Sequence, residues 1–170
     1  MEARRGGTVR VAIVTISTSR ATDHGEDESG EHLAAFGESL DAEVVARELV
    51  PDDRDEIEAA LIRCADELRC ELILTTGGTG FAPDDVTPEA TRTVIEREAP
   101  GIAEALRLES RRHTPHWMLS RGVAGIRGSS LIVNLPGNPA SIDQGGEVLR
   151  DALPHALSLL LGERPARRSH

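Results

Sequence analysis

Three short apolar runs constrain the fold of this chain more than any other feature of its sequence. They are VRVAIVTIS at residues 9–17, ELILTT at 71–76 and SLIVN at 130–134. Such runs, rich in β-branched residues, are typical of strands that are covered on both faces. A fourth run at Ala42–Val50 is more polar, which indicates a strand nearer the edge of a sheet.

Helical patterns fill the intervals between the first three strands. Gly30–Leu40 carries apolar residues on one side, and Ser29 is its expected N-cap. The next helix is expected to begin at Asp53 or Asp55, because apolar residues then recur at spacings of three, four and seven over about four turns. Each of these strands is therefore followed by a helix.

The second half of the chain continues this alternation. Thr87 is expected as an N-cap ahead of Pro88, with a helix that runs to Glu98. Another helix follows the Pro-Gly pair at 100–101. Residues 111–128 carry no strong period, and we expect a functional excursion or short elements there.

The segment NLPGNP after the last strand supplies a Pro-Gly turn with Asn138 as the N-cap of a final helix, split or kinked near Pro154. Strands that alternate with helices predict an α/β fold of three layers, with a mostly parallel sheet and helices on both faces. We expect the whole chain to form one domain, with its core at about residues 9–162 and a disordered tail at 163–170.

The charge of the chain argues against a nucleic-acid partner. It carries 29 acidic and 19 basic residues, a net charge of -10, and no tyrosine to help build a base-stacking surface. All basic residues are arginine, which excludes a Walker-type lysine or a lysine Schiff base. No apolar run is long enough to cross a membrane and no signal peptide is apparent, so we expect a cytoplasmic protein.

The cysteines and histidines do not form a recognisable reactive or metal motif. Cys64 and Cys70 lack the CxxC spacing, and we expect buried, reduced thiols and no structural metal. His24, His113 and His116 have no serine or cysteine partner in a nucleophile motif such as GxSxG. Hydrolase chemistry is therefore poorly supported.

The unusual segments of the sequence all follow strands. They are the acidic loop from Thr18, Asp52, the glycine-rich TTGGTG at 75–80 and NLPGNP at 134–139. If the four strands are parallel, these loops meet at the carboxyl edge of the sheet, where ligands bind in open α/β folds. We therefore expect the functional site at this edge.

Gly77, Gly78 and Gly80 can present backbone N–H groups to an anion ahead of a helix. The segment matches neither the dinucleotide nor the P-loop motif, and a plain tight turn is about as probable on local grounds. Asp84 and Asp85 could simply complement the helix dipole. Carboxylates beside a phosphate are unfavourable without a cation, however, so Asp52 and one or both of Asp84 and Asp85 are candidate Mg²⁺ ligands.

The remaining candidates are weaker when each is taken alone. NLPGNP is either a second anion pocket or an ordinary connection. Ser110, Ser120 and Arg121 can contact a second anionic substrate, although each is more commonly a surface residue. Asp27, in the acidic run GEDESGE, is either solvated or a minor member of the site.

Three longer segments carry a resemblance to a known family. LILTTGGTGFAPDDVTPEATRTVIERE, TPHWMLSRGVAGIRG and LIVNLPGNPAS closely resemble the MogA/MoaB family of molybdenum-cofactor biosynthesis, the molybdopterin adenylyltransferases. The likeness extends from about Val9 to Gly162. It implies a homotrimer that binds molybdopterin and Mg-ATP, transfers AMP to the terminal phosphate of molybdopterin and releases pyrophosphate. A molybdenum-insertion protein is then a candidate partner.

The resemblance also implies roles for particular residues. The two family aspartates correspond to Asp52 and Asp85, which would organise magnesium and the reacting phosphates, and the pterin-side serines correspond to Ser110 and Ser120. The nucleotide and phosphate site would comprise the two glycine turns: Gly77, Gly78, Thr79, Gly80, Asn134, Pro136, Gly137 and Asn138. Relatives often carry Ser-Asp where this chain has Ser17-Thr18, so an acidic contribution from that loop is in doubt.

Two other hypotheses fit the same residues. One is a non-catalytic pterin-binding or scaffold protein, against which the retained Asp52 and Asp85 speak. The other is a longer molybdenum-insertion or competence-damage protein that shares this domain, for which 170 residues are too few. The adenylyltransferase is the favoured expectation.

Overall fold

A computed structural model describes residues 7–23 and 26–162 of the chain. Within these ranges one six-stranded sheet has the order β2-β1-β3-β6-β5-β4. β1, β2, β3 and β6 run parallel to one another. β5 is antiparallel to both of its neighbours, β6 and β4. The strands are β1 Arg10–Ile16, β2 Glu43–Val50, β3 Leu72–Thr76, β4 Arg97–Glu98, β5 Ala124–Arg127 and β6 Ser130–Leu135.

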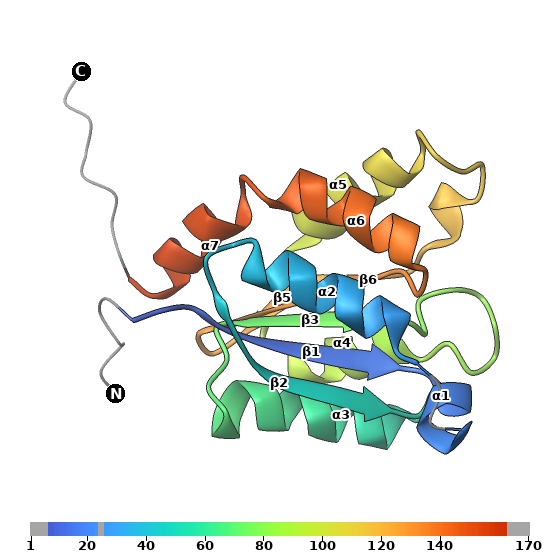
Figure 1. Cartoon of the computed structure of the whole chain (residues 1–170), viewed down its shortest axis with the longest axis horizontal. Coiled ribbons are helices and arrows are strands. Elements are labelled where there is room, and N and C mark those ends of the chain that lie inside the picture. Colours follow the sequence, from blue (N-terminus) through green and yellow to red (C-terminus); the bar gives the residue numbers. More distant parts are fainter. Residues whose placement is uncertain (1–6, 24–25, 163–170) are drawn as a thin grey trace.

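Helices cover both faces of the sheet (Figure 1), which confirms the predicted three-layer α/β fold. On one face lie α2 Glu28–Glu38, α5 Pro100–Ser110, α6 Pro139–Leu149 and α7 Leu153–Leu160. On the other lie α3 Arg54–Ile62, which continues as the π-helical turn η1 Arg63–Glu67, and α4 Thr87–Val94. Two short elements, α1 Thr18–Asp23 and the 3₁₀ turn η2 Trp117–Leu119, belong to the loops.

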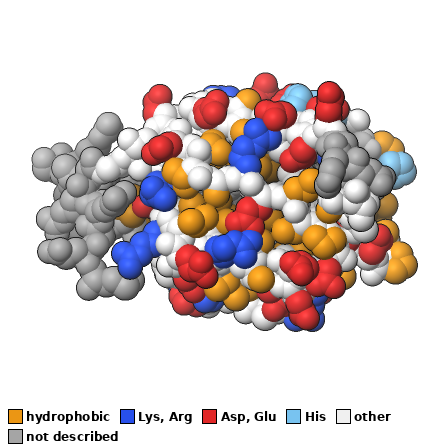
Figure 2. All heavy atoms as spheres, turned by 60° about the horizontal axis from the view of Figure 1, so that its bottom comes forward, with side chains coloured by type: hydrophobic (Ala, Val, Ile, Leu, Met, Phe, Trp, Pro, Cys, Tyr) orange, Lys and Arg blue, Asp and Glu red, His pale blue; other side chains and the backbone are white. Residues whose placement is uncertain are grey.

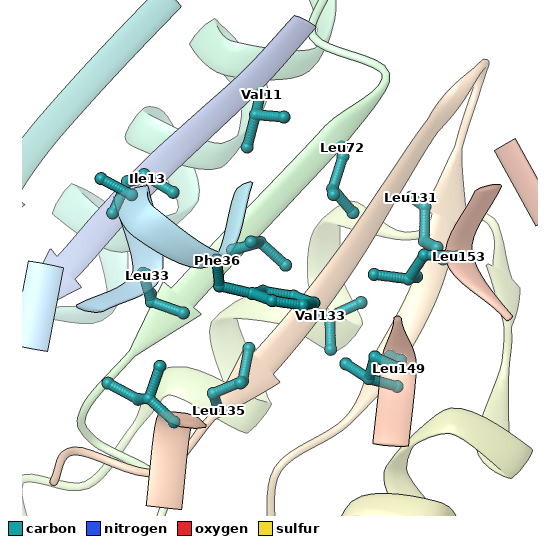
Figure 3. Close-up of a cluster of buried hydrophobic side chains, with 14 of the residues drawn as sticks. Val11, Ile13, Leu33, Phe36, Leu72, Leu131, Val133, Leu135, Leu149 and Leu153 are labelled. Carbon is teal, nitrogen blue, oxygen red and sulfur yellow. The ribbon is translucent and has the colours of Figure 1, made fainter. Parts of the chain in front are cut away.

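The buried strands divide their side chains between two apolar cores. In β1, Val11 and Ile13 face α2 while Ala12 and Val14 face α3, as the two-residue period of a strand requires. Figure 3 shows the first core, in which Phe36 of α2 lies in the middle of the labelled side chains. Both faces of these strands are buried, and this explains why their sequences are continuous apolar runs.

Local capping explains most of the helix boundaries. Asp53 caps α3 through a hydrogen bond from Glu56 N, and Asn138 caps α6 through one from Ser141 N. The expectation for α2 was wrong: Asp27 is the cap, since its carboxylate accepts from Gly30 N. Ser29 lies inside the helix.

The expected helix to Glu98 is also wrong. α4 ends at Val94, and Arg97–Glu98 pairs with β5 as a short edge strand. Thr87 is the first helical residue and not the cap, and its hydroxyl donates to the carbonyl of Gly77. The irregular segment 111–128 contains a fifth strand, β5, that its weak period did not reveal.

The two cysteines are buried free thiols, as expected. Burial is the main cause that raises the pKa of Cys64 to about 12 and that of Cys70 to about 11. Thiols with such pKa values stay protonated near neutral pH and are poor nucleophiles.

The face that carries α3 presents charged side chains of both signs. Figure 2 shows acidic and basic side chains interspersed there, with hydrophobic side chains between them. Among the described residues, no helix is long and apolar enough to cross a membrane. The tail 163–170, expected to be disordered, and His24 lie outside the described residues.

Candidate functional site

The glycine turn after β3 packs so closely against β1 that a side chain cannot fit there. Gly77 has φ +98°, and a Cβ at this position would lie 2.2 Å from the carbonyl oxygen of Ile16. Gly78 has φ +63°, and its Cβ would lie 2.3 Å from the Thr87 hydroxyl. The two left-handed conformations turn the chain from β3 toward α4.

Asp52 is held at this turn by the residue that departs from the family pattern. Its Oδ2 accepts hydrogen bonds from Thr18 N at 2.7 Å and from Thr18 Oγ1 at 2.9 Å, and its own N–H donates to Thr18 Oγ1. A Cβ on Gly78 would lie 3.4 Å from the other carboxylate oxygen, Oδ1. Thr18 thus fixes the carboxylate of Asp52 next to the glycine turn.

Asp85 borders the same turn from the side of α4. Its Oδ2 accepts from Ala82 N at 2.8 Å and would lie 2.8 Å from a Cβ on Gly80. Asp85 is half-buried and lines a cavity of about 420 Å³, whereas its neighbour Asp84 is exposed. Asp52 and Asp85 therefore flank one glycine turn, next to Gly78 and Gly80 respectively.

Arg121 holds the segment that contains Asp85. Its guanidinium donates to the carbonyls of Gly80 and Asp85 and to the carboxylate of Glu89. The backbone N–H of Arg121 donates to the carbonyl of Thr79. Partial burial acts to raise the pKa of Glu89, but the bonds and charge of Arg121, with the backbone bond, together lower it. These acceptors engage all three guanidinium nitrogens, so Arg121 positions the turn, and Arg121 also lines the cavity that Asp85 lines.

Asn134 is likewise a structural member of the site. It is 3% exposed, its amide donates to the hydroxyls of Thr75 and Thr91, and its Oδ1 accepts from Val123 N. Its side chain thereby ties β6 to β3, to α4 and to the segment before β5. A nucleotide would have to displace these bonds in order to reach it.

Replacement of Asn134 with leucine is expected to destabilise the fold. The substitution would leave the buried N–H of Val123 without its acceptor, at a cost of about 2–4 kcal/mol in the free energy of unfolding. Urea denaturation would measure this loss. Asn138→Ala, which removes only the α6 cap, should cost about 1 kcal/mol, and an equal loss in both variants would contradict the buried network.

The second glycine turn packs against the first. A Cβ on Gly137 would lie 3.4 Å from the Cα of Gly77. The carbonyl of Pro136 accepts from Thr76 Oγ1 at 2.7 Å, and that of Gly137 accepts from Ser29 Oγ at 2.8 Å. The two turns predicted from the sequence thus form one continuous surface at the carboxyl edge.

Ser110 and Ser120 come together although they lie ten residues apart. Both line a small cavity with Asn134 and Pro136, between α5 and the end of β6. The serines therefore adjoin the second glycine turn.

His113, which follows α5, makes a hydrogen bond of 3.0 Å with the carboxylate of Glu109.

Sequence reasoning missed two functional features. The role of Thr18 depends on a short helix, α1, that was expected as loop, and only the adjacency of β1 and β2 brings it to Asp52. The three guanidinium acceptors of Arg121 lie 32 to 41 residues away in the sequence. No local pattern marks either contact.

Comparison with known proteins places these features in a family. A family model described as "Probable molybdopterin binding domain" matches residues 12–155. The chain is 49% identical over 115 residues to a molybdopterin adenylyltransferase of Helicobacter pylori, covering 68% of this chain and 65% of that protein. It thus spans just under two thirds of that relative's length.

Two further matches cover more of both partners. A molybdopterin adenylyltransferase of Escherichia coli K12 is 40% identical over 150 residues, which are 85% of this chain and 75% of the relative. The crystal structure of the molybdopterin biosynthesis enzyme MoaB from Thermus thermophilus superposes with a TM-score of 0.86 at 46% identity, covering 93% of this chain and 99% of that one. The chain therefore belongs to the MogA/MoaB family of molybdenum-cofactor biosynthesis proteins.

Proposed function

We propose that this protein is a molybdopterin adenylyltransferase. In this reaction an oxygen of the terminal phosphate of molybdopterin attacks the α-phosphorus of ATP. The bond from the α-phosphorus to the bridging oxygen breaks, and its electron pair leaves with pyrophosphate. The observation that carries the proposal is that Asp52 and Asp85 border the same glycine turn at the carboxyl edge of the sheet.

Asp52 and Asp85 are suited to Mg²⁺ bound together with phosphates. Mg²⁺ keeps several waters and takes one or two carboxylates plus substrate oxygens, and Asp52 Oδ1 next to Gly78 is available for such a role. Bound there, Mg²⁺ would neutralise charge on the reacting phosphates.

The rest of the site positions two polyanions. The backbone of Gly77–Gly80 can approach phosphate oxygens closely, because these positions carry no side chain or, at Thr79, a buried one. Ser110 and Ser120 offer hydroxyls on the molybdopterin side, across the second glycine turn. Positioning and charge stabilisation then suffice without a covalent enzyme intermediate.

The assembly implied by the family resemblance is a homotrimer that supplies its product to a molybdenum-insertion protein. Exposed apolar side chains on α5 and η2 support burial against another subunit; these are Leu108, Met118 and Leu119.

The deciding experiment is incubation of the purified protein with molybdopterin, ATP and Mg²⁺, followed by detection of adenylylated pterin and pyrophosphate. Product above a protein-free control is expected. Absence of product with intact molybdopterin binding would favour the scaffold alternative.

Asp52→Asn is expected to slow AMP transfer about 100-fold or more, because the amide keeps the size of the side chain but removes its charge. Single-turnover kinetics would measure the loss. Asp53→Asn is the matched control: Asp53 caps α3, asparagine caps equally well, and its rate should stay within about twofold of wild type.

A further inference from the structure

A cavity opens where the order of the strands switches. β1 and β3 are neighbours in the sheet, and the chain leaves β1 toward β2 on one side and leaves β3 toward β4, β5 and β6 on the other. The cavity has a volume of about 230 Å³, and its lining includes Ser17, Ser19, Arg20, Thr76, Gly77 and Gly137. Most of these residues were not among the site residues expected from the sequence. The cavity adjoins both glycine turns.

Among the residues that the structure describes, Arg20 of α1 is the cationic residue that lines this cavity. Its Nη1 lies 3.4 Å from Ser29 Oγ and 3.8 Å from Asp27 Oδ1, while among the described residues its Nε and Nη2 have no hydrogen-bond partner. The carboxylate of Asp27 is already occupied, because it accepts from Gly30 N and from Thr15 Oγ1. Arg20 therefore keeps guanidinium donors for a ligand.

Four of the other lining residues carry a hydroxyl group, and these are Thr15, Ser17, Ser19 and Thr76. The hydroxyls of Ser17 and Ser19 lie 3.3 Å apart. Thr18, between them in the sequence, donates to Asp52, which does not line the cavity. A volume of 230 Å³ is smaller than the roughly 300–1,000 Å³ of pockets that enclose a whole drug-sized ligand. The cavity thus suits a small anionic group rather than a complete nucleotide.

We propose that this cavity binds the diphosphate part of the nucleotide, which leaves as pyrophosphate, and that Arg20 supplies the positive charge for it. The proposal rests on the adenylyltransferase function. As the bond to the α-phosphorus breaks, the leaving diphosphate gains negative charge, and a guanidinium donor stabilises that charge through charge-assisted hydrogen bonds. Asp52 and Asp85 then serve the α-phosphate next to it.

The test compares two ligands that differ in this group. Isothermal titration calorimetry in the presence of Mg²⁺ would measure the binding of inorganic pyrophosphate and of AMP to the full chain. Arg20→Gln is expected to raise the Kd of pyrophosphate about tenfold to a hundredfold and to leave the Kd of AMP unchanged. Arg20→Lys should restore part of the affinity. Arg150→Gln is the matched control, since Arg150 contacts Ser39 outside the cavity.

Two results would overturn the proposal. Unchanged pyrophosphate affinity in Arg20→Gln would show that the cavity does not bind the diphosphate. Equal weakening of AMP and pyrophosphate would show that Arg20 acts on the fold of the site. Arg20-dependent pyrophosphate binding without AMP transfer by the wild-type protein would support this cavity and refute the enzymatic function instead.

Discussion

Asp85→Asn should reduce AMP transfer to molybdopterin about 100-fold or more, while molybdopterin binding stays largely intact. Asparagine retains an oxygen that can accept from Ala82 N, so the turn next to Gly80 keeps its conformation. What is lost is the negative charge that, in the proposed function, would hold Mg²⁺ against the reacting phosphates. Single-turnover formation of adenylylated pterin would measure the rate.

Asp84→Asn provides the control in the adjacent position. Asp84 is exposed, has no side-chain hydrogen bond among the described residues, and does not line the cavity that Asp85 lines. The same change of charge should therefore leave the rate within about twofold of wild type. Equal losses in the two variants would mean that the net charge of the loop matters and not a placed carboxylate.

Gly77→Ala should lower the free energy of unfolding by about 3 kcal/mol or more. The added Cβ would meet the carbonyl oxygen of Ile16 at 2.2 Å, and backbone cannot move aside as a flexible side chain can. Either β1 or the turn must shift. Urea denaturation monitored by circular dichroism would measure the loss, and AMP transfer should fall with it.

Gly128→Ala separates the two causes of this loss. Gly128 also has a positive φ, +55°, but nothing lies within 4 Å of its added Cβ. It should therefore show only the conformational cost of a left-handed residue, about 1 kcal/mol. If Gly77→Ala were no worse than Gly128→Ala, the close approach of the turn to β1 would not contribute to stability.

The parts of the fold that the sequence predicted are those with the most burial. β1, β3 and β6 were recognisable because both of their faces are covered, so nearly every residue is buried and most are apolar. β4 was not, because it has two residues, both exposed and both charged. Helical propensity continued through Arg97 and Glu98, and only pairing with β5 makes them a strand.

Some features of the candidate site were likewise predictable from the sequence and others were not. Parallel topology alone predicted that Asp52 and the glycine turn would lie at one edge, since both follow parallel strands. The identity of the groups that face a ligand was not predictable in this way. Asn134 is an example. It begins the NLPGNP motif, yet its side-chain amide is hydrogen-bonded inside the fold to Thr75, Thr91 and Val123.

The bend that joins the antiparallel strands β5 and β6 lies far from the glycine turns. Because β6 runs toward the glycine turns, the hairpin bend at 128–129 that precedes it lies at the opposite end. Labels, affinity tags or fused reporters introduced at this bend would be held away from the ligands. The hairpin bend at 128–129 and the proposed site thus lie at opposite ends of the sheet.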